Sequence, residues 1–154
     1  METLGGDKVI WLPGNVEETE TDGHVDGIAA FIAPGIVLIE AEGPPDHPWH
    51  QINRANVKAM EGQTDASVRP IELVHIPEAT GNLSDHDMFC RSYVNAYICN
   101  GGVIMPKYGI AEDDYMIEVF EEFMPGRRVA QVSIPSIAIG GGGIHCITQQ
   151  EPRV

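Results

Sequence analysis

The sequence contains the same order of predicted elements twice, and this repeat limits the possible folds more than any other feature. Each copy consists of a strand, a tight turn, a second strand, a helix and a third strand. The three strands and the helix are expected at residues 24–32, 36–40, 71–76 and 49–60 in the first copy, and at 92–98, 103–105, 129–134 and 112–124 in the second. Two ββαβ units in tandem indicate an α/β repeat protein.

The turns within the two copies align them with each other. Residues 33–35 read Ala-Pro-Gly and residues 100–102 read Asn-Gly-Gly, and both are strong turn signals. A further strand is expected before the first copy at residues 9–12, and the first strand of a third unit is expected at residues 144–148. Because a repeat unit buries its sheet only against its neighbours, two units by themselves look incomplete.

Composition bounds the class of protein. A chain of 154 residues with 43% apolar residues is typical of one globular domain. The net charge of −14 disfavours nucleic acid and anionic membranes as partners, and it is compatible with a cationic small molecule. The longest apolar stretch, residues 27–39, is too short to span a bilayer. The first residues do not resemble a signal peptide.

The three cysteines are Cys90, Cys99 and Cys146, and they form no C-x-x-C pair. Their odd number favours a reduced, cytoplasmic setting. Cys146 follows the run Gly140–Gly143, where a ligand or another backbone segment can approach closely. This context favours a reactive thiol, although a single cysteine on an apolar strand is also a common buried core residue. Cys90 and Cys99 are expected to be structural.

His24 and Asp26 form the second candidate group. On a strand, residues two apart point to the same face, so an imidazole and a carboxylate would project together. Such a pair can exchange protons while holding a cationic substrate. Two alternatives remain. His-x-Asp tripeptides such as residues 24–26 are common in turns without any catalytic role, and Asp22 could serve only to form the turn before His24.

A metal site is not expected. His24, Asp26 and Cys146 could in principle bind zinc, but they leave a fourth ligand unspecified. On a strand, His145 would face away from Cys146 and would be a poor partner for it. The remaining histidines show no ligand spacing and are expected to be surface or loop residues: His47, His50, His75 and His86.

Several segments together resemble the C-terminal half of the agmatine deiminases, a bacterial branch of the peptidylarginine-deiminase-like, guanidino-group-modifying enzymes. The matching segments are residues 9–13, 21–27, 92–95, 100–104 and 141–150. The resemblance implies an α/β fold that forms part of a pentein-type propeller, with about two ββαβ modules plus a further strand. It also implies that residues 1–154 are the C-terminal part of a deiminase catalytic domain.

The resemblance implies a role for each candidate residue. Cys146 would be the nucleophile, His24 the general acid and base, and Asp26 a carboxylate that grips the guanidinium. Asp22, Asn95 and Gly142 would contact the substrate, and no cofactor would be needed. Agmatine would be hydrolysed to N-carbamoylputrescine and ammonia, in putrescine biosynthesis, through a thiouronium intermediate on the cysteine. Arginine or peptidyl-arginine could replace agmatine, and a non-catalytic remnant or interaction module is the alternative from another class.

The chain departs from the family pattern at its beginning. The family's N-terminal half supplies a second guanidinium-binding carboxylate and the glutamate of an E-G-G motif, and neither precedes residues 9–12 here. Ala96 and Ile110 also differ from the residues that the family usually has. We therefore expect a truncated chain that, when alone, deiminates slowly or not at all, and that associates with itself as a homo-oligomer or aggregates.

Overall fold

The computed structural model describes residues 5–15, 21 and 23–151. The chain divides into two compact units, Met1–Ile76 and Pro77–Val154. The boundary between them falls where the first copy of the repeat ends. Within the described residues, no helix is long and apolar enough to cross a membrane.

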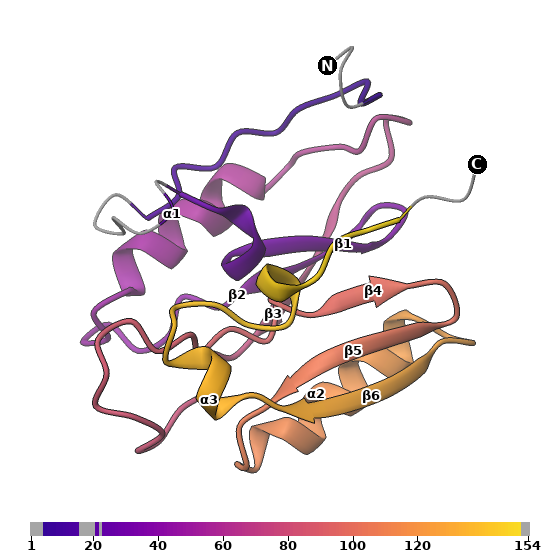
Figure 1. The fold of residues 1–154 in the computed structure, drawn as a ribbon. Helices are drawn as coiled ribbons and strands as arrows, with labels where there is room; N and C mark the ends of the chain where they lie inside the picture. The colour runs from indigo at the N-terminus through magenta and orange to yellow at the C-terminus, as the bar shows by residue number, and fades with distance from the viewer. Residues whose placement is uncertain (1–4, 16–20, 22, 152–154) are drawn as a thin grey trace. The chain divides into compact units, whose positions relative to one another are not determined.

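The N-terminal unit has the order that the sequence predicts. Strand β1 (Ala29–Ala33) pairs antiparallel with β2 (Ile36–Glu40), and β3 (Glu72–Ile76) pairs parallel with β2 after helix α1 (His50–Met60). Figure 1 shows these elements in indigo to magenta, with α1 alongside the sheet. This is one complete ββαβ unit.

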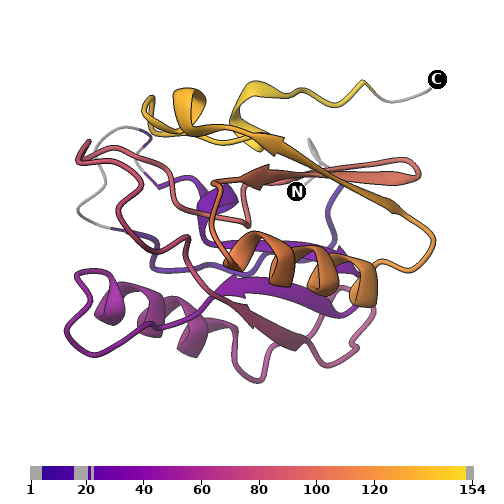
Figure 2. The same ribbon diagram turned by 90° about the horizontal axis from the view of Figure 1, so that it is seen from below.

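The C-terminal unit repeats this arrangement. Strand β4 (Tyr97–Cys99) pairs antiparallel with β5 (Gly102–Lys107), and β6 (Arg128–Ser133) pairs parallel with β5 after helix α2 (Glu112–Phe123). Figure 2 shows α2 running along the strands of this sheet. The short helix α3 (Pro135–Ala138) and a 3-10 turn, η2 (His145–Ile147), follow β6. The prediction of two ββαβ modules is confirmed.

Equivalent turns fix the start of the third strand in each unit. Gly35 and Gly101 both have positive φ, 76° and 78°, which a glycine adopts without strain. The Glu72 N–H donates to the Gly35 carbonyl at 2.8 Å, and the Arg128 N–H donates to the Gly101 carbonyl at 3.0 Å. The β1–β2 and β4–β5 turns therefore also begin the parallel ladders to β3 and β6.

Each unit has its own apolar core between sheet and helix. In the N-terminal unit, Ala29, Val37 and Ile39 cluster with Val57 and Met60 of α1. In the C-terminal unit, the apolar core includes Val103 and Met105 of β5 and Met116, Val119 and Phe120 of α2. The spacing of apolar residues in 112–124 predicts one stripe made of Tyr115, Val119, Phe120 and Phe123, and this prediction is wrong at its first position. Tyr115 is 47% exposed, and Asp113 and Met116 lie on the buried face instead.

Two strands expected at the ends of the repeat are absent. Residues 9–12 belong to neither sheet. Ile10 and Leu12 pack against the core of the N-terminal unit, whereas Trp11 is 86% exposed, so the apolar alternation reflects packing without a strand partner. Residues 145–147 form η2, so the expected strand of a third unit is wrong. The propeller arrangement and the assignment to a catalytic domain stay predictions.

The expectation for the histidines was wrong at one position. His50, the first residue of α1, is buried, and its Nδ1 lies 3.1 Å from the Glu42 carbonyl and 3.0 Å from the Gly43 carbonyl. Because carbonyl oxygens only accept, Nδ1 is the protonated nitrogen. His50 therefore ties α1 to the segment after β2. His75 and His86 are exposed, as expected.

Asp113 is the centre of a buried hydrogen-bond network in the C-terminal unit. Its carboxylate accepts from the Tyr93 hydroxyl at 2.8 Å and from three backbone N–H groups, those of Tyr108, Gly109 and Ile110. Burial alone would raise the pKa of Asp113, but these hydrogen bonds outweigh it and hold the pKa below its usual value of 3.8. Burial and the bond to Asp113 also raise the pKa of Tyr93 far above its usual range. Tyr93 therefore stays a hydrogen-bond donor.

The Asp113→Asn variant is expected to lose about 2–3 kcal/mol of unfolding free energy at pH 7, because the N–H and O–H donors lose a charged acceptor. The folded-state pKa lies below 3.8, so the charge of Asp113 stabilises fully above that pH and its contribution is lost as pH falls through the folded value. Urea unfolding of both proteins at pH 7 and near pH 2.5 measures this. If the difference in unfolding free energy between the two proteins is as large near pH 2.5 as at pH 7, the prediction is contradicted.

Candidate functional site

The side chain of Asn95 holds Cys146 in the C-terminal unit. The Cys146 N–H donates to Asn95 Oδ1 at 3.3 Å, and Asn95 Nδ2 donates to Cys146 Sγ at 3.2 Å. A backbone N–H can only donate, so Oδ1 must face it, and this orientation directs the amide N–H groups at the sulfur. The His145 N–H adds a third bond, to the Asn95 carbonyl at 3.2 Å. Asn95 is 2% exposed, so it is a fixed support.

Two glycines let the cysteine loop lie against this support. A Cβ on Gly143 would stand 2.7 Å from Asn95 Oδ1, and a Cβ on Gly142 would stand 2.8 Å from Cys146 Cβ. Real Cβ atoms do not approach other atoms so closely. The glycine run therefore allows a close approach, as the sequence predicts, but the groups that approach Gly142 and Gly143 are side chains of this unit. Gly142 contacts the Cys146 side chain, and its predicted contact with substrate stays a prediction.

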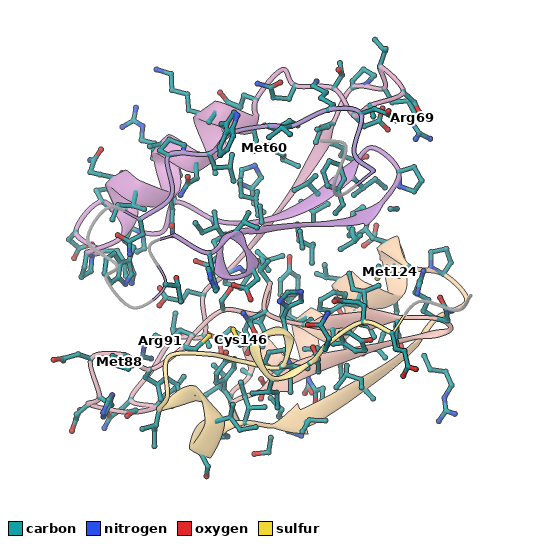
Figure 3. All side chains as sticks on the ribbon, turned by 45° about the horizontal axis from the view of Figure 1, so that its top comes forward. Met60, Arg69, Met88, Arg91, Met124 and Cys146 are labelled. Atoms are coloured by element: carbon teal, nitrogen blue, oxygen red, sulfur yellow. The ribbon has the colours of Figure 1, made fainter. Side chains whose placement is uncertain are left out.

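Cys146 itself is exposed on η2, a turn near the end of the described chain. Figure 3 shows Cys146 together with Met88 and Arg91, which belong to the same unit. The turn is closed by the Ile147 N–H to the Ile144 carbonyl at 3.3 Å and by the Thr148 N–H to the His145 carbonyl at 3.0 Å. Because the segment is not a strand, the alternation argument no longer separates His145 from Cys146.

The segment that carries Asn95 is also not a strand before Tyr97. The Val94 N–H donates to Ser92 Oγ at 3.2 Å, and the Ala96 N–H donates to the Val94 carbonyl at 2.7 Å. Local acceptors therefore take the donors that a strand would give to its neighbour, and a serine side chain is well suited to this competition. The expected strand over residues 92–98 shortens to β4.

His24 and Asp26 lie in the N-terminal unit, on a turn where a strand was expected. Val25–Gly27 forms a 3-10 turn, η1, closed by the Ile28 N–H to the Val25 carbonyl at 2.8 Å, and β1 starts only at Ala29. His24 is the extended residue before the turn and is exposed, and Asp26 lies within it, half-buried. The argument that both side chains share a strand face is therefore wrong. Asp22 lies outside the described residues.

The other cysteines differ from Cys146 in exposure. Cys90 and Cys99 are half-buried. Cys99 Sγ donates to the Gly102 carbonyl at 3.6 Å, inside the β4–β5 turn. Among the residues that the structure describes, no three His, Cys, Asp or Glu side chains are grouped as metal ligands.

This arrangement is suited to a nucleophile. The exposed sulfur can reach a substrate, and the amide donor from Asn95 stabilises negative charge on it. Sequence reasoning named Asn95 only as a substrate contact and missed that it supports the cysteine. The sequence carried one signal for the close approach, the run Gly140–Gly143, but no signal for the partner that approaches.

Comparison with known proteins places these features in a family. The sequence profile described as Porphyromonas-type peptidyl-arginine deiminase matches residues 1–152. A Streptomyces coelicolor protein provisionally named an agmatine deiminase is 39% identical over 160 residues, which cover 97% of this chain and 46% of that protein. A Legionella pneumophila protein with the same provisional name is 35% identical, and the match covers 97% of this chain and 43% of the protein. The chain spans about half the length of these relatives.

Solved structures share the fold. The structure of an agmatine deiminase from Enterococcus faecalis superposes with a TM-score of 0.81 at 30% identity, over 94% of this chain and 44% of that one. The structure of a Porphyromonas gingivalis protein, provisionally named an arginine deiminase, gives a TM-score of 0.80 at 26% identity, over 86% of this chain and 39% of that one. The two small mixed sheets are therefore those of an α/β deiminase fold.

Proposed function

We propose that this chain contributes the nucleophile of a hydrolase that acts on guanidinium groups, because the chain belongs to the Porphyromonas-type peptidyl-arginine deiminase family. The observation that carries the proposal is the exposed Cys146 with the Asn95 amide donating to its sulfur. The proposed substrate is agmatine, in line with the names of the relatives and with the net charge of −14, which suits a cation.

In the proposed reaction, the Cys146 thiolate adds to the central carbon of the guanidinium. The carbon–nitrogen bond then breaks, and ammonia leaves with a proton from His24. His24 next takes a proton from water, whose oxygen attacks the thiouronium carbon. Cleavage of the carbon–sulfur bond then restores the thiolate, and the remaining hydroxyl proton is released to solvent as the ureido C=O forms. The products are a ureido compound, N-carbamoylputrescine in the case of agmatine, and ammonia.

Asp26 is proposed to hold the guanidinium. A guanidinium is planar and always charged, and a carboxylate can accept two of its N–H groups at once. Asp22 and Asn95 are the further proposed substrate contacts. Since Asn95 already bonds to Cys146 through both ends of its amide, we propose that it acts mainly on the cysteine.

Arginine or a peptidyl-arginine is the second candidate substrate. The description of the matching family and the name of the Porphyromonas gingivalis protein favour it. The relative values of kcat/KM for agmatine, free arginine and an arginine peptide distinguish the two candidates, because a peptide needs room at the far end of the substrate that agmatine does not.

The test uses the purified chain and a hybrid in which residues 1–152 replace the matching segment of the Enterococcus faecalis protein. The hybrid is expected to release ureido product from agmatine, and the chain alone to do so hundreds of times more slowly, since each missing charge-assisted hydrogen bond lowers the rate. In the hybrid, His24→Asn should cost about 10²–10⁴-fold in kcat, as loss of a general acid and base does.

The control is His75→Asn, at an exposed histidine of β3 in the same unit. It should keep the turnover of the hybrid. A hybrid that folds and hydrolyses none of the three guanidines, or equal losses in the two histidine variants, contradicts the proposed function.

A further inference from the structure

Asn95 lies on an irregular segment whose position is set by side chains. Residues 92–96 are buried but are not part of a sheet ladder. One anchor is the Tyr108 hydroxyl, which donates to the Ser92 carbonyl at 3.3 Å. The other is the Tyr93 hydroxyl, which donates to Asp113 Oδ1 at 2.8 Å. Tyr93 is two residues before Asn95, so its hydrogen bond to Asp113 anchors the same short segment that supports the cysteine.

We propose that the hydrogen bond from Tyr93 to Asp113 positions Asn95 and, through Asn95, the Cys146 sulfur. Tyr93 and Asp113 are then positioning residues for the nucleophile, an assignment that rests on the proposed function. Both side chains are almost fully buried, at 0% and 2% exposed, so their hydrogen bond is shielded from water.

The geometry favours positioning over simple packing. Asp113 sits in the first turn of α2, so its carboxylate is fixed to a regular element. It also accepts hydrogen bonds from the N–H groups of Tyr108, Gly109 and Ile110. The Tyr108 ring stands edge-on to the Tyr93 ring, with 5.2 Å between the ring centroids. A buried carboxylate carries a desolvation cost that apolar side chains at the same position would not have. Here the charge fixes one tyrosine hydroxyl at a defined point.

The chain of contacts continues to the sulfur without a gap. Tyr93 fixes the segment, Asn95 follows on it, Gly143 lies against Asn95, and the amide of Asn95 bonds to both the backbone and the sulfur of Cys146. Removal of the Tyr93 hydroxyl leaves the ring in place but frees the segment to shift. A shift of Asn95 withdraws the N–H donor from the sulfur.

The test measures alkylation of the cysteines by iodoacetamide at pH 7, followed by peptide mass spectrometry. Tyr93→Phe should slow the alkylation of Cys146 about tenfold, because a displaced Asn95 no longer holds the sulfur in place with its N–H donor, while Cys99 in the same molecule keeps its rate. Asn95→Ala should slow Cys146 at least as much. The double variant Tyr93→Phe, Asn95→Ala should be no slower than Asn95→Ala alone, since Tyr93 acts through Asn95.

Two controls separate positioning from stability. Tyr115→Phe removes a hydroxyl from an exposed tyrosine of α2 and should leave the Cys146 rate unchanged. Val119→Ala creates a cavity beneath α2, so it should lower the melting temperature without selectively slowing Cys146. Asp113→Asn tests the same hydrogen bond from its acceptor side and should slow the alkylation of Cys146 but not of Cys99. It replaces Tyr93→Phe in the experiment if that variant does not fold.

Additive losses in the double variant, an unchanged Cys146 rate in Tyr93→Phe, or an equal selective loss in Val119→Ala would overturn the proposal. Alkylation needs no guanidine, so these outcomes do not depend on turnover. If the alkylation pattern is as expected but the hybrid hydrolyses no guanidine, the proposed function fails and the positioning role stands. In an active hybrid, Tyr93→Phe should lower kcat and leave KM nearly unchanged, because the thiol is displaced and Asp26 is not.

Discussion

Cys146→Ser is expected to abolish the release of ureido product from agmatine, with a loss of about 10⁴-fold or more. Serine keeps the size of the side chain, but its hydroxyl is a far weaker nucleophile at neutral pH and a poor leaving group from the covalent intermediate. The side chain is exposed on η2, so the fold should be unaffected. The measurement is steady-state turnover in the hybrid, with circular dichroism to verify the fold.

Cys99→Ser is the matched control. The Cys99 thiol is half-buried and donates within the β4–β5 turn, a role that a serine hydroxyl can take over. Turnover should therefore stay within about threefold of the parent, the usual scale of a small packing change away from the reaction. Equal losses in the two variants would refute the assignment of Cys146 as the nucleophile.

The Gly143→Ala variant is expected to have the second largest effect. The new Cβ would lie 2.7 Å from Asn95 Oδ1 and 3.1 Å from Asn95 Cβ, so one of the two segments must move. Asn95 is buried and bonded at both ends of its amide, and it cannot yield without releasing Cys146. We expect turnover to fall about 100-fold, because small misplacements of reacting groups cost this much, and unfolding free energy to fall by about 1–3 kcal/mol.

Two further glycine variants make the result specific. Gly142→Ala should also lower turnover, because its Cβ would stand 2.8 Å from Cys146 Cβ, which does not move when the side chain rotates, so the turn that carries Cys146 must shift. It should cost less stability than Gly143→Ala, because Cys146 is exposed whereas Asn95 is buried. Gly6→Ala has open space around its Cβ and should change neither quantity. Full turnover in Gly143→Ala would show that the close approach to Asn95 has no part in the reaction.

The order of elements in both units could be predicted from the sequence because it depends on local signals. The helical spacing of apolar residues indicated α1 and α2, and alternating or continuous apolar runs indicated β2, β3, β5 and β6. The Pro-Gly and Asn-Gly pairs indicated the turns that begin the parallel ladders. These signals act between residues that are neighbours in the chain. The two copies could therefore be aligned before any tertiary contact was known.

The local structure at the candidate residues was predicted wrongly, and for one reason. Residues 25–27, 92–96 and 145–147 have apolar or alternating character, yet each uses turn-forming hydrogen bonds in place of a strand ladder. Whether a short apolar segment joins a sheet depends on whether a partner strand offers its donors and acceptors. A partner distant in sequence leaves no mark in the segment itself.

The sequence by itself determined the family resemblance, the two ββαβ units and the identity of the candidate cysteine, because these depend on residue types and their spacing. Only the tertiary structure decided what supports that cysteine. Asn95 and Cys146 are 51 positions apart, and Tyr93 and Asp113 are 20 apart, so each pair meets only when the C-terminal unit is folded. Such contacts depend on how closely two segments pack, and at Gly143 the addition of one carbon atom would already be too much. The spacing of residues along a chain does not encode how closely distant segments pack.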